Sequence, residues 1–96
     1  MFNMFELGQI VITRGINLLM SKDQSFNQFL SGVLYLYGCC YWGDTCPEDK
    51  ISNDEAVKAG NLRIHSVYIY PKLNKEIWII TEADRSVTTI LLPEEY

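Results

Sequence analysis

Residues Glu76–Tyr96 read EIWIITEADRSVTTILLPEEY, and this stretch predicts the centre of a β-sheet. Ile77–Thr81 and Val87–Ile90 consist of β-branched or aromatic residues, which suit the pleated, half-buried surface of a strand. Between them, Glu82–Ser86 is polar and has the length of a hairpin connection. The stretch therefore predicts an antiparallel hairpin in the middle of a sheet.

The composition is that of one globular domain. The chain has 96 residues, of which 48% are hydrophobic and 21% are charged. A chain of this size and composition has enough apolar surface to form one core. Because no repeat, low-complexity tract or Gly/Ser linker interrupts it, we expect a single domain over residues 1–96.

The formal net charge of −4 favours some classes of binding partner over others. An acidic chain is poorly suited to neutralise phosphates, so direct binding of nucleic acid is disfavoured. The same charge suits docking on a basic surface of another protein.

Cysteine usage and the N-terminal sequence indicate the compartment. The three cysteines, Cys39, Cys40 and Cys46, are an odd number in a chain without a secretory leader, which argues against a disulfide framework. No apolar stretch approaches the length that spans a bilayer. We expect a cytoplasmic protein that binds no membrane.

Two more strands are predicted before the hairpin. Leu7–Thr13 contains a β-branched run between glycines and predicts a short, buried strand. Asn61–Tyr70 alternates well enough to form a third consecutive antiparallel strand with the hairpin. One of its faces carries Ile64, Ser66, Tyr68 and Tyr70.

The main helix is predicted over Ser25–Gly38, after one or two helical turns at Ile16–Met20. Ser25 and Gln28 match a capping box at its start. Its apolar residues recur at helical spacing on one stripe, which predicts packing on the sheet. The stripe consists of Phe26, Phe29, Leu30, Val33, Leu34 and Tyr37. Tyr35 and Leu36 lie off the stripe and predict either an exposed apolar spot or a second contact that they cover.

A second helix is predicted over Pro47–Ala59 and ends at Gly60, a residue suited to the left-handed position that follows a helix. Thr45 and Glu48 match a capping box at its start. Acidic residues near a helix start are stabilised by the helix dipole, which accounts for them without a partner.

The functional interpretation of the same region is an acidic, aromatic-rimmed surface that binds a partner. Here Trp42 and Tyr41 would anchor the partner, and carboxylates would meet its Lys and Arg side chains. The predicted partner-binding residues are Tyr41, Trp42, Asp44, Glu48, Asp49, Asp54 and Glu55.

Catalytic and metal-binding alternatives have less support. Zinc would require Cys39, Cys40, Cys46 and His65, but no CxxC pair is present, and we expect neither a metal nor another cofactor. The polar cluster most like an active site is Glu82, Asp84 and Arg85, because carboxylates beside an arginine can perform acid–base chemistry. More often such a cluster is a turn held by its own hydrogen bonds.

Residues along nearly the whole chain carry a family resemblance. They are Trp42-Gly43-Asp44, Glu48-Asp49, Asn53, Ala56, Gly60, Ser66, Tyr68 and Ile77–Tyr96. In these positions the chain resembles a family of small proteins found on bacterial plasmids, prophages and other mobile elements, with a GDWGD-like centre and a closing WIITEADRS…TTILLPEEY. The resemblance implies a genetic setting in a bacterial host cell more than an activity. One departure is Cys40-Tyr41, where that centre has Gly-Asp.

These observations predict an α+β domain with a four-stranded, mostly antiparallel sheet and two or three helices packed on one face. The preferred function is a non-enzymatic acidic protein that inhibits or modulates a host nucleic-acid-handling complex, in anti-CRISPR or anti-restriction fashion. The alternative is a small metal-dependent hydrolase or nuclease-like enzyme that uses Glu82, Asp84 and Arg85. A third possibility is a homodimer formed through a free sheet edge or the Tyr35–Leu36 spot.

Overall fold

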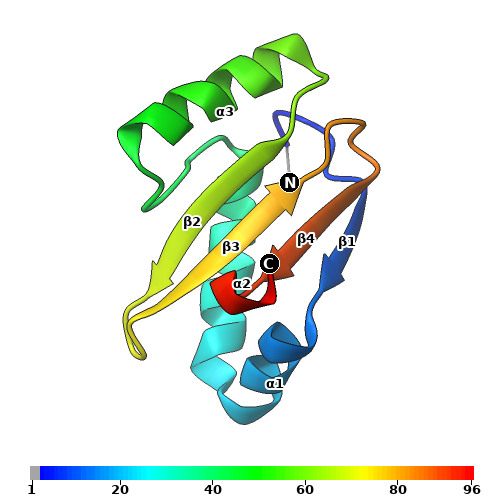
Figure 1. Ribbon diagram of the computed structural model, residues 1–96. Coiled ribbons are helices and arrows are strands. Elements are labelled where there is room, and N and C mark those ends of the chain that lie inside the picture. Colours follow the sequence, from blue (N-terminus) through cyan, green and yellow to red (C-terminus); the bar gives the residue numbers. More distant parts are fainter. Residues whose placement is uncertain (1–2) are drawn as a thin grey trace.

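A computed structural model of the chain describes residues 3–96 and shows three helices on a four-stranded sheet (Figure 1). The elements, in chain order, are β1 (Gln9–Ile12), α1 (Arg14–Lys22), α2 (Gln24–Gly38), α3 (Pro47–Ala59), β2 (Ile64–Tyr70), β3 (Lys75–Thr81), β4 (Val87–Leu91) and the 3₁₀ helix η1 (Pro93–Glu95).

The strands lie in the order β1-β4-β3-β2. β3 is antiparallel to both β2 and β4, whereas β1 runs parallel to β4 at one edge. The predicted hairpin is confirmed, because β3 and β4 pair from Trp78↔Leu91 to Thr81↔Thr88 and take the two central positions. The predicted fold class, α+β with a mostly antiparallel four-stranded sheet, is confirmed as well.

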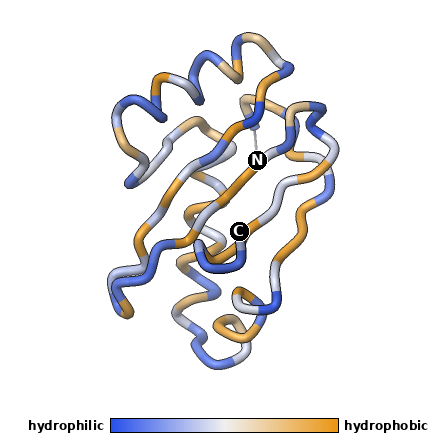
Figure 2. Tube along the Cα trace, viewed as in Figure 1, coloured by the Kyte–Doolittle hydropathy of each residue, from blue (hydrophilic) through white to orange (hydrophobic). Residues whose placement is uncertain are grey.

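The core lies between α2 and one face of the sheet. α2 crosses behind the strands, with α1 next to it, and α3 lies beside the outer edge of β2 (Figure 1). The predicted α2 stripe is confirmed, with Phe26, Leu30, Val33 and Tyr37 buried and Phe29 and Leu34 partly buried. The middle of β3 is hydrophobic, whereas α3 is predominantly hydrophilic (Figure 2).

The two predicted capping boxes are wrong. α2 begins one residue before Ser25, and its N-cap is Asp23, whose carboxylate accepts a hydrogen bond from the Ser25 backbone N–H at 3.0 Å. α3 has Cys46 as its N-cap, without a side-chain cap. Thr45 is not available for capping, because its hydroxyl accepts a hydrogen bond from the backbone N–H of Val67 at 2.8 Å. A tertiary contact has replaced the local one in this case.

The N-terminal strand also differs from its prediction. β1 is shorter than Leu7–Thr13, and it is not buried, since Ile10 and Ile12 are 44% and 39% exposed. Gly8 precedes it with a φ of +65°, and a Cβ atom there would lie 2.4 Å from the carbonyl oxygen of Ser86. α1 is longer than the one or two turns predicted, and β2 begins at Ile64 rather than Asn61.

Among the helices of residues 3–96, none combines the length and the apolar character needed to cross a membrane.

Candidate functional site

The Trp42–Thr45 segment lies along the outer edge of β2. Gly43 forms an isolated bridge with Val67, and the Asp44 backbone N–H donates to the Val67 carbonyl at 2.8 Å. The Asp44 carboxylate accepts the backbone N–H of Ile69 at 2.8 Å. Gly43 has a φ of +61°, and a Cβ there would lie 2.4 Å from the Tyr68 ring. Asp44 is thus committed to strand pairing, although it lies at the surface.

Two other side chains complete the pairing of this edge. The Thr45 hydroxyl binds the Val67 N–H, and the buried Asn53 of α3 binds both backbone groups of His65. Together, Asp44, Thr45 and Asn53 satisfy backbone groups that an edge strand normally exposes to pairing with another chain. We call the backbone of residues 65–69, with these three partners, the sealed edge.

Trp42 belongs to the core. It is 5% exposed, and its ring lies 5.6 Å from that of Tyr37 and 6.1 Å from that of Phe5. Its indole N–H donates to the carboxylate of Asp54 at 2.9 Å. In this conformation Trp42 is therefore not exposed for anchoring a partner, and Asp54 holds the indole in place.

The remaining predicted partner-binding residues do not form one surface. Glu48 lies three residues before Ile51, and Glu55 lies four residues after it. At this spacing the three side chains share one side of α3. Ile51 is 61% exposed. Asp49 instead precedes the buried Asn53 by four residues and lies on the side of α3 nearer the sheet. We call Glu48, Ile51 and Glu55 the outer face of α3.

Tyr41 is the most exposed aromatic residue of the centre, at 67%. Its backbone is fixed from both sides, because its N–H donates to the Leu36 carbonyl and its own carbonyl accepts the Tyr68 hydroxyl at 2.6 Å. The phenol ring is therefore held at the surface, where a partner could contact it.

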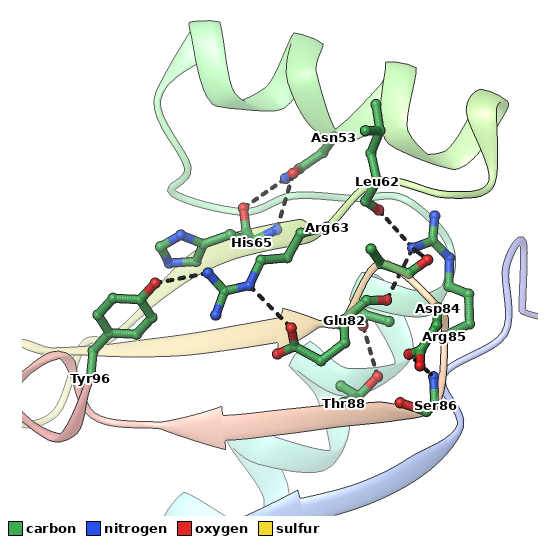
Figure 3. A network of polar contacts seen from close by, with 12 residues as sticks. Asn53, Leu62, Arg63, His65, Glu82, Asp84, Arg85, Ser86, Thr88 and Tyr96 are labelled. Carbon is green, nitrogen blue, oxygen red and sulfur yellow. Dashed lines mark hydrogen bonds and ion pairs between the residues drawn. The ribbon is translucent and has the colours of Figure 1, made fainter.

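Arg85, in the hairpin turn, binds backbone carbonyls (Figure 3). Its guanidinium donates to the Leu62 carbonyl at 2.7 Å, to the Ala56 carbonyl at 2.9 Å, and more weakly to two carbonyls of its own turn. Ala56 lies in the last turn of α3, where a positive charge is favourable. Arg85 thus connects the hairpin to the end of α3.

The two carboxylates of this turn have different partners. Asp84 accepts the Ser86 backbone N–H at 2.9 Å, and hydrogen bonds from Ser86 lower the pKa of the Asp84 carboxyl. Glu82 pairs with Arg63 at 3.5 Å on the surface. A general acid needs a raised pKa, which the Asp84 carboxyl lacks. Because Glu82 pairs with Arg63 and Arg85 binds backbone carbonyls, the cluster is arranged as a structural turn.

The sequence interpretation overlooked a cluster on the face of the sheet opposite α2. The Trp78 ring lies 4.6 Å from His65 and 5.6 Å from Tyr96, and the Tyr96 hydroxyl accepts from Arg63 at 2.8 Å. Burial lowers the pKa of His65, and the charge of Arg63 lowers it further. The predicted alternation puts His65 on the face of β2 opposite Ile64 and Ser66, and Arg63 precedes the strand on the same side as His65, which was the available signal for this cluster. Nothing in residues 93–96 indicated that Tyr96 packs there.

Metal ligands are not gathered in this fold. Within residues 3–96, no three His, Cys, Asp or Glu side chains lie together in a way that could hold a metal ion. Cys39, Cys40, Cys46 and His65 are thus not arranged as a zinc site.

The fold and these contacts define a small α+β domain with one edge of its sheet sealed by its own side chains. Comparisons of the chain with protein-family models, curated proteins and solved structures found no match.

Proposed function

We propose that this protein acts by binding another protein through the outer face of α3, without chemistry of its own. The observation that supports this proposal is Ile51, an exposed apolar side chain with Glu48 and Glu55 on either side of it along the helix. An apolar centre with a charged rim is the usual anatomy of a protein–protein contact. Because the rim is acidic, the complementary surface is basic.

The partner class follows from charge. Grooves that hold nucleic-acid phosphates are lined by Lys and Arg and are strongly positive, and an acidic helix is suited to occupy one. A chain with a net charge of −4 is attracted to such a groove rather than to nucleic acid itself. The resemblance to mobile-element proteins points to host defence complexes. The proposed function is therefore inhibition or modulation of a host nucleic-acid-handling complex, of anti-CRISPR or anti-restriction type.

The test uses tagged protein in extracts of its host cells, with recovery followed by mass spectrometry across a series of salt concentrations. A stoichiometric nucleic-acid-handling partner that is lost as salt rises supports the proposal. With that partner purified, Glu48→Lys and Glu55→Lys should each weaken binding about tenfold or more, because they place like charges together. Ile51→Ala should also weaken it.

The matched control is Glu94→Lys, which makes the same charge change on η1, away from α3. If it weakens binding as much as Glu48→Lys, only net charge matters and the proposed surface is wrong. Recovery of the protein alone at low salt would contradict the function itself.

The metal-dependent hydrolase gains no support from a specific contact, since the Arg85 guanidinium is bound to backbone carbonyls. A rise in melting temperature on addition of divalent ions would favour that alternative over the one proposed.

A further inference from the structure

The two edges of the sheet differ in how their backbone groups are satisfied. The β2 edge is the sealed edge, paired by Asp44, Thr45 and Asn53. The β1 edge lies on the opposite side of the sheet from α3, and no other described element lies beyond it (Figure 1). Within residues 3–96, no side chains pair the outward backbone groups of β1 as Asp44, Thr45 and Asn53 pair those of β2.

The backbone groups that β1 presents outward belong to Ile10 and Ile12. Gln9 N–H donates to the Ser86 carbonyl at 3.0 Å, and Thr13 N–H donates to the Ile90 carbonyl at 3.1 Å. In a strand, the backbone N–H and C=O groups of successive residues point to opposite sides. Because Gln9 and Thr13 bond β4, the N–H and C=O groups of Ile10 and Ile12 point away from β4. Their partners are not found among the described residues.

The side chains beside this open edge are apolar. Ile10 and Ile12, 44% and 39% exposed, lie along a groove of about 460 Å³ between β1 and the α1–α2 helices. Met20, Leu30 and Leu34 are among the residues that line the groove. An exposed strand with an apolar flank is a site for pairing with another strand.

We propose that the β1 edge pairs with β1 of a second copy of this chain, antiparallel across a two-fold axis at Val11. This register places Ile10 opposite Ile12 of the second copy, so that the outward N–H and C=O groups of both residues are paired. It also brings the exposed isoleucines of both copies together beside their grooves.

Charge favours this occupant over an unrelated strand. Gln9–Ile12 carries no charge, so nothing repels a second copy along the strand itself. Glu6 lies before β1 and Arg14 lies after it, both exposed, and neither forms an ion pair within residues 3–96. Antiparallel pairing brings the Glu6 end of one copy to the Arg14 end of the other. The acidic α3 helices then lie at the two far ends of the joined sheet, where they repel each other least.

This inference does not depend on the proposed function, because it uses the opposite edge of the sheet. The first test is the mass in solution, by light scattering across a dilution series. We expect a species near twice the 11.1 kDa of one chain, and a monomer at every concentration would overturn the proposal.

Ile10→Lys should raise the dissociation constant of the dimer more than about a hundredfold, since it buries a charge against an apolar strand. The matched control is Ile69→Lys, which changes a similarly exposed isoleucine (38%) on the sealed edge. If both variants dissociate the dimer equally, or neither does, the assigned edge is wrong. An unfolding curve for each variant confirms that the monomer is folded.

The register has its own test. Val11→Cys should form an intermolecular disulfide on mild oxidation, because opposed Cα atoms without mutual hydrogen bonds lie about 4.5 Å apart. Gln9→Cys is the control, since the two copies of residue 9 would lie roughly 13 Å apart. Oxidised wild-type protein reports any linkage through the native cysteines, and mass spectrometry identifies the linked peptide. Equal cross-linking at residues 9 and 11 would overturn the register.

Glu6 and Arg14, at the two ends of β1, give a third test, which distinguishes a second copy of this chain from a strand of another protein. Glu6→Arg and Arg14→Glu should each weaken the dimer, and the double variant should restore it, because both charges meet their opposites again. If the double variant is weaker than either single variant, the occupant of the edge is not a second copy in this orientation.

Discussion

The side chain of Asn53 binds both backbone groups of His65. Its amide Nδ2 donates to the His65 carbonyl at 2.8 Å, and its Oδ1 accepts the His65 N–H at 3.1 Å. Asn53 therefore does for the β2 edge what a neighbouring strand would do, and it does so from a buried position on a hydrophilic helix.

Asn53→Ala should lower the free energy of unfolding by about 2–3 kcal/mol, because it leaves an N–H and a C=O of the strand without partners. Urea denaturation measures this change. Ser52→Ala, at an exposed neighbouring position of α3, is the control and should change stability by less than about 0.5 kcal/mol. Equal stability of the two variants would show that water replaces Asn53 without cost.

The hairpin and the α2 stripe could be predicted from sequence because their signals are local. Alternation and helical spacing follow from the geometry of one element. The local pattern alone therefore places residues such as Ile79 and Leu30 in the core. The sealed edge could not be predicted in this way. Thr45 matched a helix cap, yet its hydroxyl binds Val67, 22 residues further along the chain.

The predicted surface was incomplete for the same reason. Aspartate and tryptophan residues near a helix start look available to a partner, but Asp44 pairs with the backbone of β2, and Asp54 binds the indole of a buried Trp42. Ile51 was not singled out from the sequence. Asn53 and Ala56 are buried, and Ile51 lies two and five residues before them, which puts it on the opposite side of the helix. This spacing was the available signal that Ile51 faces solvent.

Asp23 should make stability depend on acid pH. Its carboxylate accepts the Ser25 backbone N–H and hydroxyl, at 3.0 and 2.6 Å, and the Tyr70 hydroxyl at 2.8 Å. The hydrogen bonds from Ser25, followed by that from Tyr70, hold the pKa of Asp23 well below its ordinary value of 3.8. As pH falls below 3.8, the unfolded chain binds a proton that the folded chain does not. The folded state therefore loses stability progressively down to the folded pKa.

Asp23→Asn should remove this part of the pH dependence. Unfolding curves between about pH 5 and pH 2 should show a smaller loss of stability for the variant than for the wild type. Some dependence remains, because hydrogen bonds also lower the pKa values of Asp84 and Glu95. Glu94→Gln, at an exposed position of η1, should keep the full dependence. An unchanged slope in Asp23→Asn would contradict the assignment.

Arg85 should contribute to stability rather than to chemistry. Arg85→Ala is expected to cost about 2–3 kcal/mol, since it removes a charged donor from the carbonyls of Ala56 and Leu62. Arg85→Lys should recover only part of this, because one ammonium cannot reproduce the fork of two nitrogen atoms. Lys50→Ala, at an exposed position of α3, is a surface control. A hydrolytic activity that disappears in Arg85→Ala while stability is unchanged would reverse the assignment.

The backbone at Arg85 provides a matched comparison. Its φ is +62°, a region that costs a residue with a Cβ more than it costs glycine. Arg85→Gly should therefore be more stable than Arg85→Ala by roughly 0.5–1 kcal/mol, although both lose the guanidinium. If glycine is the less stable of the two, the left-handed backbone at this position does not penalise a Cβ atom in the variants, and the strain argument is wrong.

A chain of buried hydroxyls joins α2 to the sheet, and its proton order can be assigned. The Thr88 hydroxyl lies 2.6 Å from the Leu7 carbonyl, which can only accept, so Thr88 donates there. Thr88 then accepts from Thr81 at 2.7 Å, and Thr81 accepts from the Tyr37 hydroxyl at 2.6 Å. Burial raises the pKa of Tyr37 above its ordinary value of 10.0, which keeps this first donor protonated.

The proton order predicts that variants of this chain are unequal. Tyr37→Phe removes only the first donor and leaves one hydroxyl oxygen with an unused acceptor site, so it should cost about 1 kcal/mol. Thr88→Val leaves the buried Leu7 carbonyl without a donor and the Thr81 hydroxyl without an acceptor, so it should cost about 3 kcal/mol. Both substitutions nearly keep the side-chain volume, which limits any contribution from a cavity. Urea denaturation of the two variants decides the matter. If Tyr37→Phe costs as much as Thr88→Val, the protons do not run from Tyr37 toward Leu7, and the buried chain is organised in another way.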